Sequence, residues 1–244
     1  MWFAVTEVDG WLRRLAGWRL EGAPAPGGCP TGIGGVLPAI RQSKLVGVLA
    51  AAVTAGDIEV TAADRDIVDD AHRTAMGEVL LLEDVMLEAV EVLDRAGVGH
   101  RVLKGSALAH LVYPDPSERS FGDVDLLVEG RLLPTAVAAL VAAGAERVQP
   151  ALSEDFDRRF TKSVTLRWQR GTELDLHRTL APGPFGLLVR PADVRADPRV
   201  LSLAGRALDT PPVEVHLLHG ALHAALGDVE PRLGSLRDIA LMVR

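Results

Sequence analysis

Apolar residues recur at helical spacing along the first part of the chain. Their steps of three and four residues predict helices at 36–55 and 62–96. Thr61 is the predicted N-cap of the second helix, with Asp64 three residues later. The apolar stripe of this helix comprises Ile67, Ala71, Ala75, Val79, Leu82, Val85, Ala89 and Leu93. Residues 1–34 end in a Pro- and Gly-rich run, which predicts a peripheral helix followed by a loop.

From residue 98 onward, short apolar runs separated by Gly and Pro predict strands that alternate with helices. The predicted elements are a strand at 100–104, a helix at 106–113, a strand at 123–128, a helix at 131–145, a strand at 146–149 and a hairpin within 162–177. A Pro-rich linker at 181–198 precedes two further helices at 212–226 and 231–244. This order predicts an α+β (mixed α/β) fold, with a small mixed β-sheet between flanking helices. The predicted division is a helical N-terminal segment at 1–97, a core at 98–180, and a linker with C-terminal helices at 181–244.

The composition narrows the classes of protein that fit this pattern. The net charge is −7, from 33 acidic and 26 basic residues, which argues against general nucleic-acid binding. No apolar run reaches the roughly 18 residues of a membrane-spanning helix, and no signal-peptide pattern opens the chain. The single cysteine, Cys29, cannot form an internal disulfide. We therefore expect a cytoplasmic protein with no membrane partner.

Two aspartates stand two residues apart in the predicted strand at 123–128. Because alternate strand residues share a face, the carboxylates of Asp123 and Asp125 are expected to project together. Like charges held close in an apolar strand repel and are costly to desolvate, and a divalent cation such as Mg²⁺ or Mn²⁺ relieves both costs. The alternative is a strand end at the solvent edge, where water hydrates both carboxylates.

A Gly-Ser pair lies at the start of the predicted helix at 106–113. Unpaired backbone N–H groups, the helix dipole and the Ser106 hydroxyl form a small anion site there, and Gly105 permits close approach of a ligand. Ordinary N-capping is the simpler interpretation of these two residues taken alone.

A third acidic position follows in the second strand of the predicted hairpin. Glu173, Asp175 and His177 share one strand face, and the intervening leucines share the other. A further carboxylate on a neighbouring strand completes a two-metal site, in which the ions clamp the attacking and leaving oxygens of phosphoryl transfer.

These motifs together resemble a known family. The residues are Lys104-Gly105-Ser106, Tyr113, Arg119, Gly122-Asp123-Val124-Asp125-Leu126-Leu127-Val128 and Asp175-Leu176-His177. The pattern is similar to that of the uncharacterised bacterial nucleotidyltransferase family in the polymerase β-like superfamily, and it covers about residues 36–244. Sixteen residues (107–122) separate the Gly-Ser pair from the first aspartate, which is long for the superfamily but usual with the Leu-Lys-Gly form. Glu173 and Asp175 are both candidates for the third acid, and the Asp-Leu-His pattern favours Asp175.

The resemblance implies an enzyme, a metal-dependent nucleotidyltransferase. Such an enzyme moves a nucleoside monophosphate from a nucleoside triphosphate (NTP) to a hydroxyl-type acceptor and releases pyrophosphate. The acceptor is unknown and could be a small molecule, a peptide or protein, or an RNA end. Asp123 and Asp125 would bind two Mg²⁺ (or Mn²⁺) ions, and Asp175 would hold the catalytic metal and help to deprotonate the acceptor.

The resemblance also implies which residues bind the nucleotide. Gly105 and Ser106 would hold the β- and γ-phosphates, while Lys104 and Arg119 would neutralise phosphate charge. Lys104 has an alternative interpretation as the surface-facing end of a strand. The candidates for substrate contact are His177 and Glu173.

The C-terminal helices carry two further polar groups. His216, His219 and His223 fall on one helix face, and we expect them to line the cleft or to lie half-buried against the sheet. A metal site is the alternative, although no Cys or helical Glu lies nearby to complete it. Arg237 and Asp238 predict a surface or interhelical ion pair of small energetic value.

Alternative functions stay open at this point. The pattern also resembles toxin-type nucleotidyltransferases, which makes tRNA an alternative acceptor. The basic run at 158–170 could steer a triphosphate or an RNA end, but a solvated hairpin face is simpler, with Trp168 packing across strands rather than stacking on a base. The remaining alternatives are a catalytically degenerate nucleotide-binding module and an Asp-x-Asp glycosyltransferase.

Overall fold

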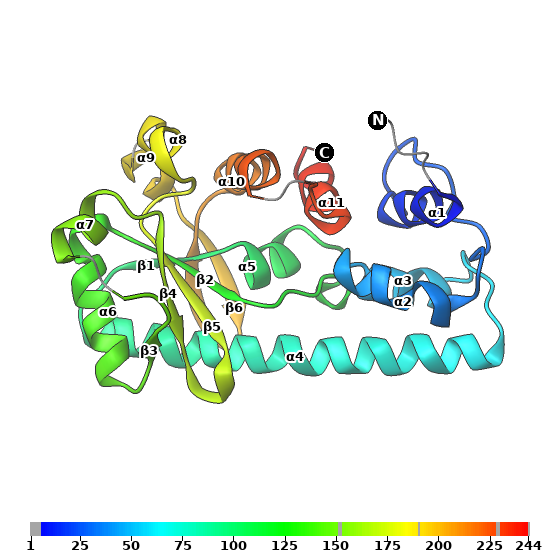
Figure 1. Ribbon diagram of the computed structural model, residues 1–244, viewed down its shortest axis with the longest axis horizontal. Coiled ribbons are helices and arrows are strands. Elements are labelled where there is room, and N and C mark those ends of the chain that lie inside the picture. Colours follow the sequence, from blue (N-terminus) through cyan, green and yellow to red (C-terminus); the bar gives the residue numbers. More distant parts are fainter. Residues whose placement is uncertain (1–5, 151–152, 190, 228–229, 244) are drawn as a thin grey trace.

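The chain folds into helices around two β-sheets. A computed structural model describes residues 6–150, 153–189, 191–227 and 230–243 (Figure 1). Its larger sheet has five strands in the order β1-β2-β5-β4-β3, and its smaller sheet pairs β6 with β7. The strands are β1 (His100–Leu103), β2 (Val124–Val128), β3 (Glu146–Arg147), β4 (Ser163–Arg167), β5 (Glu173–His177), β6 (Arg199–Leu203) and β7 (Arg206–Thr210). The mixed sheet and its flanking helices confirm the predicted α+β class.

The centre of the larger sheet is the parallel pair β2–β5. The other neighbours, β1–β2, β5–β4 and β4–β3, are antiparallel. The predicted hairpin is confirmed, because β4 and β5 pair through a short turn that includes Arg170 and Gly171. Strand β2 begins one residue later than predicted, so Asp123 lies immediately before it.

Eleven α-helices surround these strands in the described part of the chain. They are α1 (Glu7–Ala16), α2 (Ile33–Gln42), α3 (Val46–Thr54), α4 (Ala62–Arg95), α5 (Lys104–Leu111), α6 (Leu133–Ala142), α7 (Glu154–Arg159), α8 (Gly183–Leu188), α9 (Pro191–Arg195), α10 (Val213–Leu226) and α11 (Leu233–Met242). None of these helices is long and apolar enough to cross a membrane.

The long helix α4 joins the two hydrophobic clusters of the molecule. Its N-cap is as predicted, because the Thr61 side chain accepts a hydrogen bond from the Asp64 backbone at 3.1 Å. The first half of α4 packs into a cluster with α1, α2 and α3, and the second half packs into the cluster under the sheet. In Figure 1 this helix runs below the sheet on the left and below α1, α2 and α3 on the right. The division at residue 97 remains a prediction, since α4 belongs to both clusters.

Two expectations for the N-terminal segment are wrong. Its first helix is not peripheral, because Trp11 is completely buried. The helix predicted at 36–55 is two helices, α2 and α3, separated by a turn in which Lys44 has a φ of +59°. The turn lets Leu45 reach full burial in the N-terminal cluster, and the apolar pattern continues across it without a Gly or Pro to mark the break.

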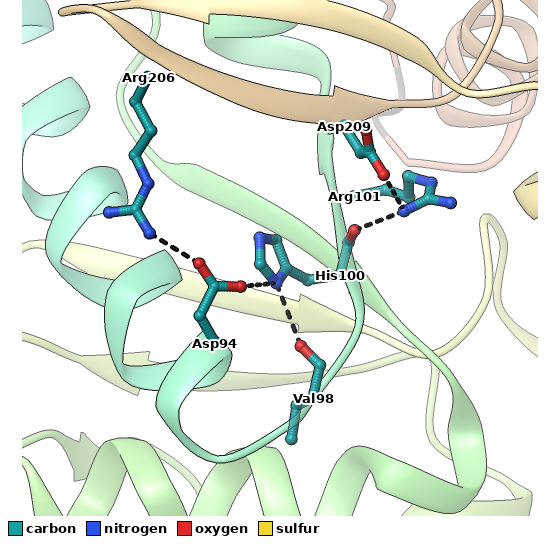
Figure 2. Close-up of polar contacts among 6 residues, drawn as sticks. All are labelled: Asp94, Val98, His100, Arg101, Arg206 and Asp209. Atoms are coloured by element: carbon teal, nitrogen blue, oxygen red, sulfur yellow. Dashed lines mark hydrogen bonds and ion pairs between the residues drawn. The ribbon is translucent and has the colours of Figure 1, made fainter.

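The segment after the main sheet contains structure that the sequence pattern did not indicate. The predicted linker at 181–198 includes α8 and α9, and residues 199–210 form the β6–β7 hairpin. Its two turn residues, Ala204 and Gly205, both have positive φ, as a tight hairpin turn requires. Figure 2 shows how the hairpin is fixed: Arg206 binds Asp94 at 2.6 Å, and Arg101 binds Asp209 at 2.8 Å.

The predicted C-terminal helices are confirmed as α10 and α11. Figure 1 shows α11 between α10 and α1, so the end of the chain packs against its beginning. Arg237 makes this contact from inside the molecule, where it donates to the backbone oxygens of Ala16 at 2.9 Å and Trp18 at 2.6 Å. The surface alternative is therefore wrong, because Arg237 is buried and its ion-pair partner is Glu118 of the short helix Pro116–Glu118, at 3.4 Å.

Two glycines in helices test this packing. A Cβ at Gly47 of α3 would lie 2.2 Å from the Ser117 backbone oxygen, whereas a Cβ at Gly77 of α4 would meet nothing within 4 Å. We expect Gly47→Ala to lower the free energy of unfolding by about 1–3 kcal/mol through overpacking. The control, Gly77→Ala, should raise it by about 0.5–1 kcal/mol because alanine favours the helix. Urea unfolding measures both changes, and equal values for the two variants would contradict the packing of α3.

Candidate active site

Asp125 and Asp175 lie side by side in the centre of the sheet. The parallel register of β2 and β5 sets Asp125 directly opposite Asp175. In-register neighbours on adjacent strands project to the same face of a sheet. Asp125, Asp175 and His177 consequently bring one ligand atom each within 4.8 Å of one another. The structure thus joins the two acidic motifs that lie fifty residues apart in the sequence.

Asp125 is buried and held by two cationic or polar neighbours. His177 donates from Nε2 to Asp125 Oδ1 at 2.6 Å, and the Lys104 ammonium lies 3.0 Å from the same oxygen. Burial by itself raises the pKa of Asp125, but Lys104 and His177 outweigh burial and hold this pKa well below its usual range. The second oxygen, Oδ2, is buried and has no hydrogen-bond partner among the described residues. An ionised carboxylate with one unused buried oxygen is suited to bind a cation.

The other two aspartates complete an acidic cluster. Thr165, opposite Asp175 on β4, donates to Asp175 Oδ1 at 2.5 Å and so fixes that carboxylate. Burial, assisted by the charges of Asp125 and Asp175, raises the pKa of Asp123. A bound divalent cation would offset this repulsion. Three oxygen-donor side chains with an orphaned buried oxygen fit a hard ion such as Mg²⁺ or Mn²⁺.

The Lys104-Gly105-Ser106 segment forms the first turn of α5 rather than the end of a strand. Gly105 interrupts helical geometry with a φ of 0° and a ψ of −102°. A Cβ at Gly105 would lie 3.1 Å from the Phe121 ring, so close packing requires the glycine. The Ser106 hydroxyl is buried and donates to Glu83 Oε1 at 2.7 Å, an oxygen that also accepts from His110 at 2.8 Å. Gly105 lines the cavity beside the aspartates, whereas this hydroxyl is engaged by α4.

Arg119 connects the α5 turn to the C-terminal helix. Its Nη1 donates to the Gly105 backbone oxygen at 2.8 Å, while Nε and Nη2 donate to the Asp238 carboxylate at 2.9 Å and 2.8 Å. Tyr113 also donates to Asp238, at 2.7 Å. Asp238 is therefore buried in a network with the core and is not the partner of Arg237, contrary to the prediction.

A cavity of about 270 Å³ opens beside this cluster. Its walls come from four parts of the chain that are distant in the sequence: the α2–α3 turn, the α5–β2 region, Glu173 of β5 and the C-terminal helices. Lys44, Lys104, Asp123, Asp125 and Glu173 all line it. Both positive and negative side chains thus face one space, as a site for metal ions and a phosphorylated ligand requires.

The three histidines of α10 are divided by burial. His216 and His223 line the cavity, as expected for two of the three. His216 and His219 are fully buried rather than half-buried. His219 contacts the His177 ring edge-on, with 5.6 Å between ring centres. Within the described residues the acidic cluster, not this helix face, supplies the metal-ligand geometry.

Two lysines of this site were missed by sequence reasoning. Lys44 lines the cavity, and Lys162, in the run predicted to be a solvated face, is half-buried near Asp125 and Asp175. Burial lowers the pKa of both ammonium groups. Lysine is rare here: Lys44, Lys104 and Lys162 are the only lysines among 26 basic residues, and that rarity was the available signal. The neighbouring Trp168 is buried in the main cluster, which confirms its packing role.

The chain was compared with known proteins. A family model described as "Uncharacterised nucleotidyltransferase" matches residues 30–244. A comparison with curated proteins found no match.

Similar folds occur among solved structures. The crystal structure of lincomycin-bound lincosamide antibiotic adenylyltransferase LnuA is 14% identical with a TM-score of 0.45, and the match covers 66% of this chain and 96% of that chain. A nucleotidyltransferase-like antigen from Paracoccidioides brasiliensis is 21% identical with a TM-score of 0.42, covering 69% and 77%. The structure of ANT(2")-Ia with adenylyl-2"-tobramycin is 11% identical with a TM-score of 0.46, covering 65% and 86%. At these identities and scores, no activity is transferred from any of them.

His216 provides a test of the buried wall of the cavity. Thr210 donates its hydroxyl proton to Val102 and accepts from His216 at 2.8 Å, and burial lowers the pKa of His216 to about 4. An unfolded histidine titrates near 6.5, so the unfolded chain binds more protons between these values, and stability falls as the pH falls through this window. Between pH 7 and pH 4.5, the wild type should lose about 2–3 kcal/mol more unfolding free energy than His216→Gln. Urea unfolding at both pH values measures this difference, and equal losses would contradict the buried neutral imidazole.

Proposed function

Because the chain belongs to the uncharacterised nucleotidyltransferase family, we propose that it transfers a nucleoside monophosphate from an NTP to a hydroxyl-type acceptor and releases pyrophosphate. The observation that carries this proposal is the in-register pair of Asp125 and Asp175, with Asp123 at the edge of the same cavity. Three carboxylates from two adjacent segments converge where an unused buried oxygen, Asp125 Oδ2, is present.

In this proposal Asp123, Asp125 and Asp175 hold two Mg²⁺ (or Mn²⁺) ions. Bound ions supply charge stabilisation at the attacking and leaving oxygens of phosphoryl transfer. Lys104 and His177 keep Asp125 ionised and oriented, because both contact its Oδ1. His177 is completely buried, which makes it a positioning residue for Asp125 rather than a substrate contact.

Asp175 serves as the base in the proposed reaction. Its Oδ1 is held by Thr165, which leaves Oδ2 to accept the proton of the acceptor hydroxyl. The acceptor oxygen then bonds to the α-phosphorus, the bond from that phosphorus to the bridging oxygen of the β-phosphate breaks, and pyrophosphate leaves. Glu173 lies two residues before Asp175 on β5 and lines the cavity, so it is a candidate contact for the acceptor.

The phosphates of the NTP are proposed to lie against the first turn of α5. Lys104 and Gly105 line the cavity there. Ser106 contributes its hydroxyl only if it leaves Glu83. Arg119 acts through Gly105, whose carbonyl oxygen it holds, and is a positioning residue for the turn.

Aspartate-to-asparagine variants test the proposal with little change of shape. Asp123→Asn and Asp175→Asn each remove a ligand charge, and each should lower Mg²⁺-dependent nucleotidyl transfer by more than about 100-fold. Asp125 is less suitable, because its loss leaves Lys104 and His177 unpaired in the core. Transfer is measured with NTPs labelled at the α-phosphate.

The matched control is Asp209→Asn, which breaks the ion pair with Arg101, and neither of these residues lines the cavity. We expect wild-type transfer from this control. Metal-dependent transfer that persists in both site variants would refute the two-metal assignment.

The acceptor class is tested in the same assay. Labelled ATP, CTP, GTP and UTP are each incubated with the enzyme and cell extract, and the labelled product is then treated with nuclease or protease. Label in tRNA would support the toxin-type alternative, and label in protein or in a small molecule would support the other acceptor classes. NTP binding without transfer would support a catalytically degenerate module.

A further inference from the structure

Lys44 stands out among the residues around the cavity because its segment lies outside the nucleotidyltransferase motifs. It occupies the turn between α2 and α3, far from the Lys104–His177 region in the sequence. Its side chain nevertheless lines the cavity with Lys104 and Asp123. With Lys162 near the same carboxylates, every lysine of the chain is placed around the acidic cluster.

The backbone of Lys44 is in a conformation that favours glycine. Its φ of +59° lies in the left-handed region, where a Cβ is unfavourable. The turn is held in place from the C-terminal end of the chain, because the Gly234 backbone N–H donates to the Ser43 carbonyl oxygen at 2.9 Å. A lysine at such a position is less stable than a glycine would be.

The Lys44 side chain is half-buried where it lines the cavity, and its ammonium group has no hydrogen bond or ion pair among the described residues. Burial lowers its pKa, and the charge of Asp123 only partly offsets this effect. A Cβ at Gly122 would lie 2.9 Å from Lys44 Nζ, so the missing side chain at Gly122 leaves room for the ammonium group. A desolvated cation that opens onto a cavity is suited to an anionic ligand.

We propose that Lys44 binds the phosphate chain of the nucleotide and that the N-terminal helical segment thereby completes the nucleotide site. This inference rests on the proposed function. Lys44 is close enough to Asp123 for their charges to interact, so a metal ion bound at Asp123 would bring the phosphates of the nucleotide near both side chains. Arg232, on the C-terminal side of the cavity, adds a second positive side chain to this wall. The phosphate chain therefore lies between the α5 turn and the α2–α3 turn.

Lys44→Gly separates this role from a structural one. Glycine relieves the left-handed backbone and removes a desolvated charge, so the thermal midpoint should stay the same or rise. The same variant should weaken binding of the Mg²⁺ complexes of NTPs and of inorganic tripolyphosphate by about tenfold or more, since one charge-assisted hydrogen bond is lost. Isothermal titration calorimetry measures both ligands.

Arg170→Gly is the matched control. Arg170 has the same φ of +59° but is exposed at the β4–β5 turn, and we expect a similar change in stability with unchanged binding. Lys44→Met keeps the strained backbone and the length of the side chain without the charge, and it should weaken binding as much as Lys44→Gly. This second variant keeps the test valid if Lys44→Gly is unstable.

The outcomes distinguish this inference from the proposed function. A wild-type protein that binds neither the NTPs nor tripolyphosphate would overturn the proposed function. Wild-type binding that is equally tight in Lys44→Gly and Lys44→Met would overturn the Lys44 assignment alone. Weaker NTP binding with unchanged tripolyphosphate binding would also overturn it, because the contact would then be to the base or ribose.

Discussion

The negative charge of three neighbouring aspartates is the constraint on which the rest of the site depends; Asp125 is buried, Asp175 half-buried and Asp123 exposed. Asp125 and Asp175 are forced together by the register of two parallel strands, and Asp123 follows one step outside the sheet. Carboxylates in this position raise each other's pKa unless cations neutralise them. Lys104 does so for Asp125 by direct contact, His177 forms a hydrogen bond with the same oxygen, and the charges of Lys44 and Lys162 also act on the cluster. Three lysines against three aspartates leave the cluster formally neutral. Two divalent ions and a triphosphate of about −4 charge would also sum to zero, so a metal–nucleotide complex can enter without a net change of buried charge.

Long-range contacts fix the positions of the two turns that line the cavity. Arg119 bonds at once to the Gly105 turn and to Asp238 of α11, so the helix that ends the chain determines where the α5 turn lies. Gly234, four residues earlier in α11, holds the turn that carries Lys44. The same helix therefore positions both lysine-bearing segments of the cavity. A site assembled in this way needs the N-terminal segment, the sheet and the C-terminal helices together, although the motif residues all lie within 104–177.

The periodicity of the sequence predicted the features that depend on neighbouring residues, such as strand faces and helices. The two-residue repeat in the acidic motifs predicted that Asp175 and His177 share one face of a strand, and the three- and four-residue steps predicted α4 with its Thr61 cap. Several of the failures involve distant partners. The break before Leu45 follows from its burial among α1–α4, and the pairing of Asp238 with Arg119 spans 119 residues, so neither is visible in neighbouring side chains. The hydroxyl of Ser106 was assigned to a phosphate because nothing near it in sequence shows Glu83 on α4.

Strained backbone at the two cavity lysines shows how function competes with local preference. Lys44 and Lys104 both have positive φ, at +59° and +42°, and a non-glycine residue in this region costs on the order of 1–2 kcal/mol. Glycine would remove that cost at either position, but it would also remove a cation from a cluster of carboxylates. At Lys104 the ammonium group is already bonded to Asp125, so its charge offsets the cost within the protein itself. At Lys44 no described group bonds to the ammonium, which leaves it available to the phosphate ligand that we propose. Both lysines have a strained backbone, but only Lys104 is paired. This contrast supports the proposed position of the phosphate chain beside the N-terminal segment.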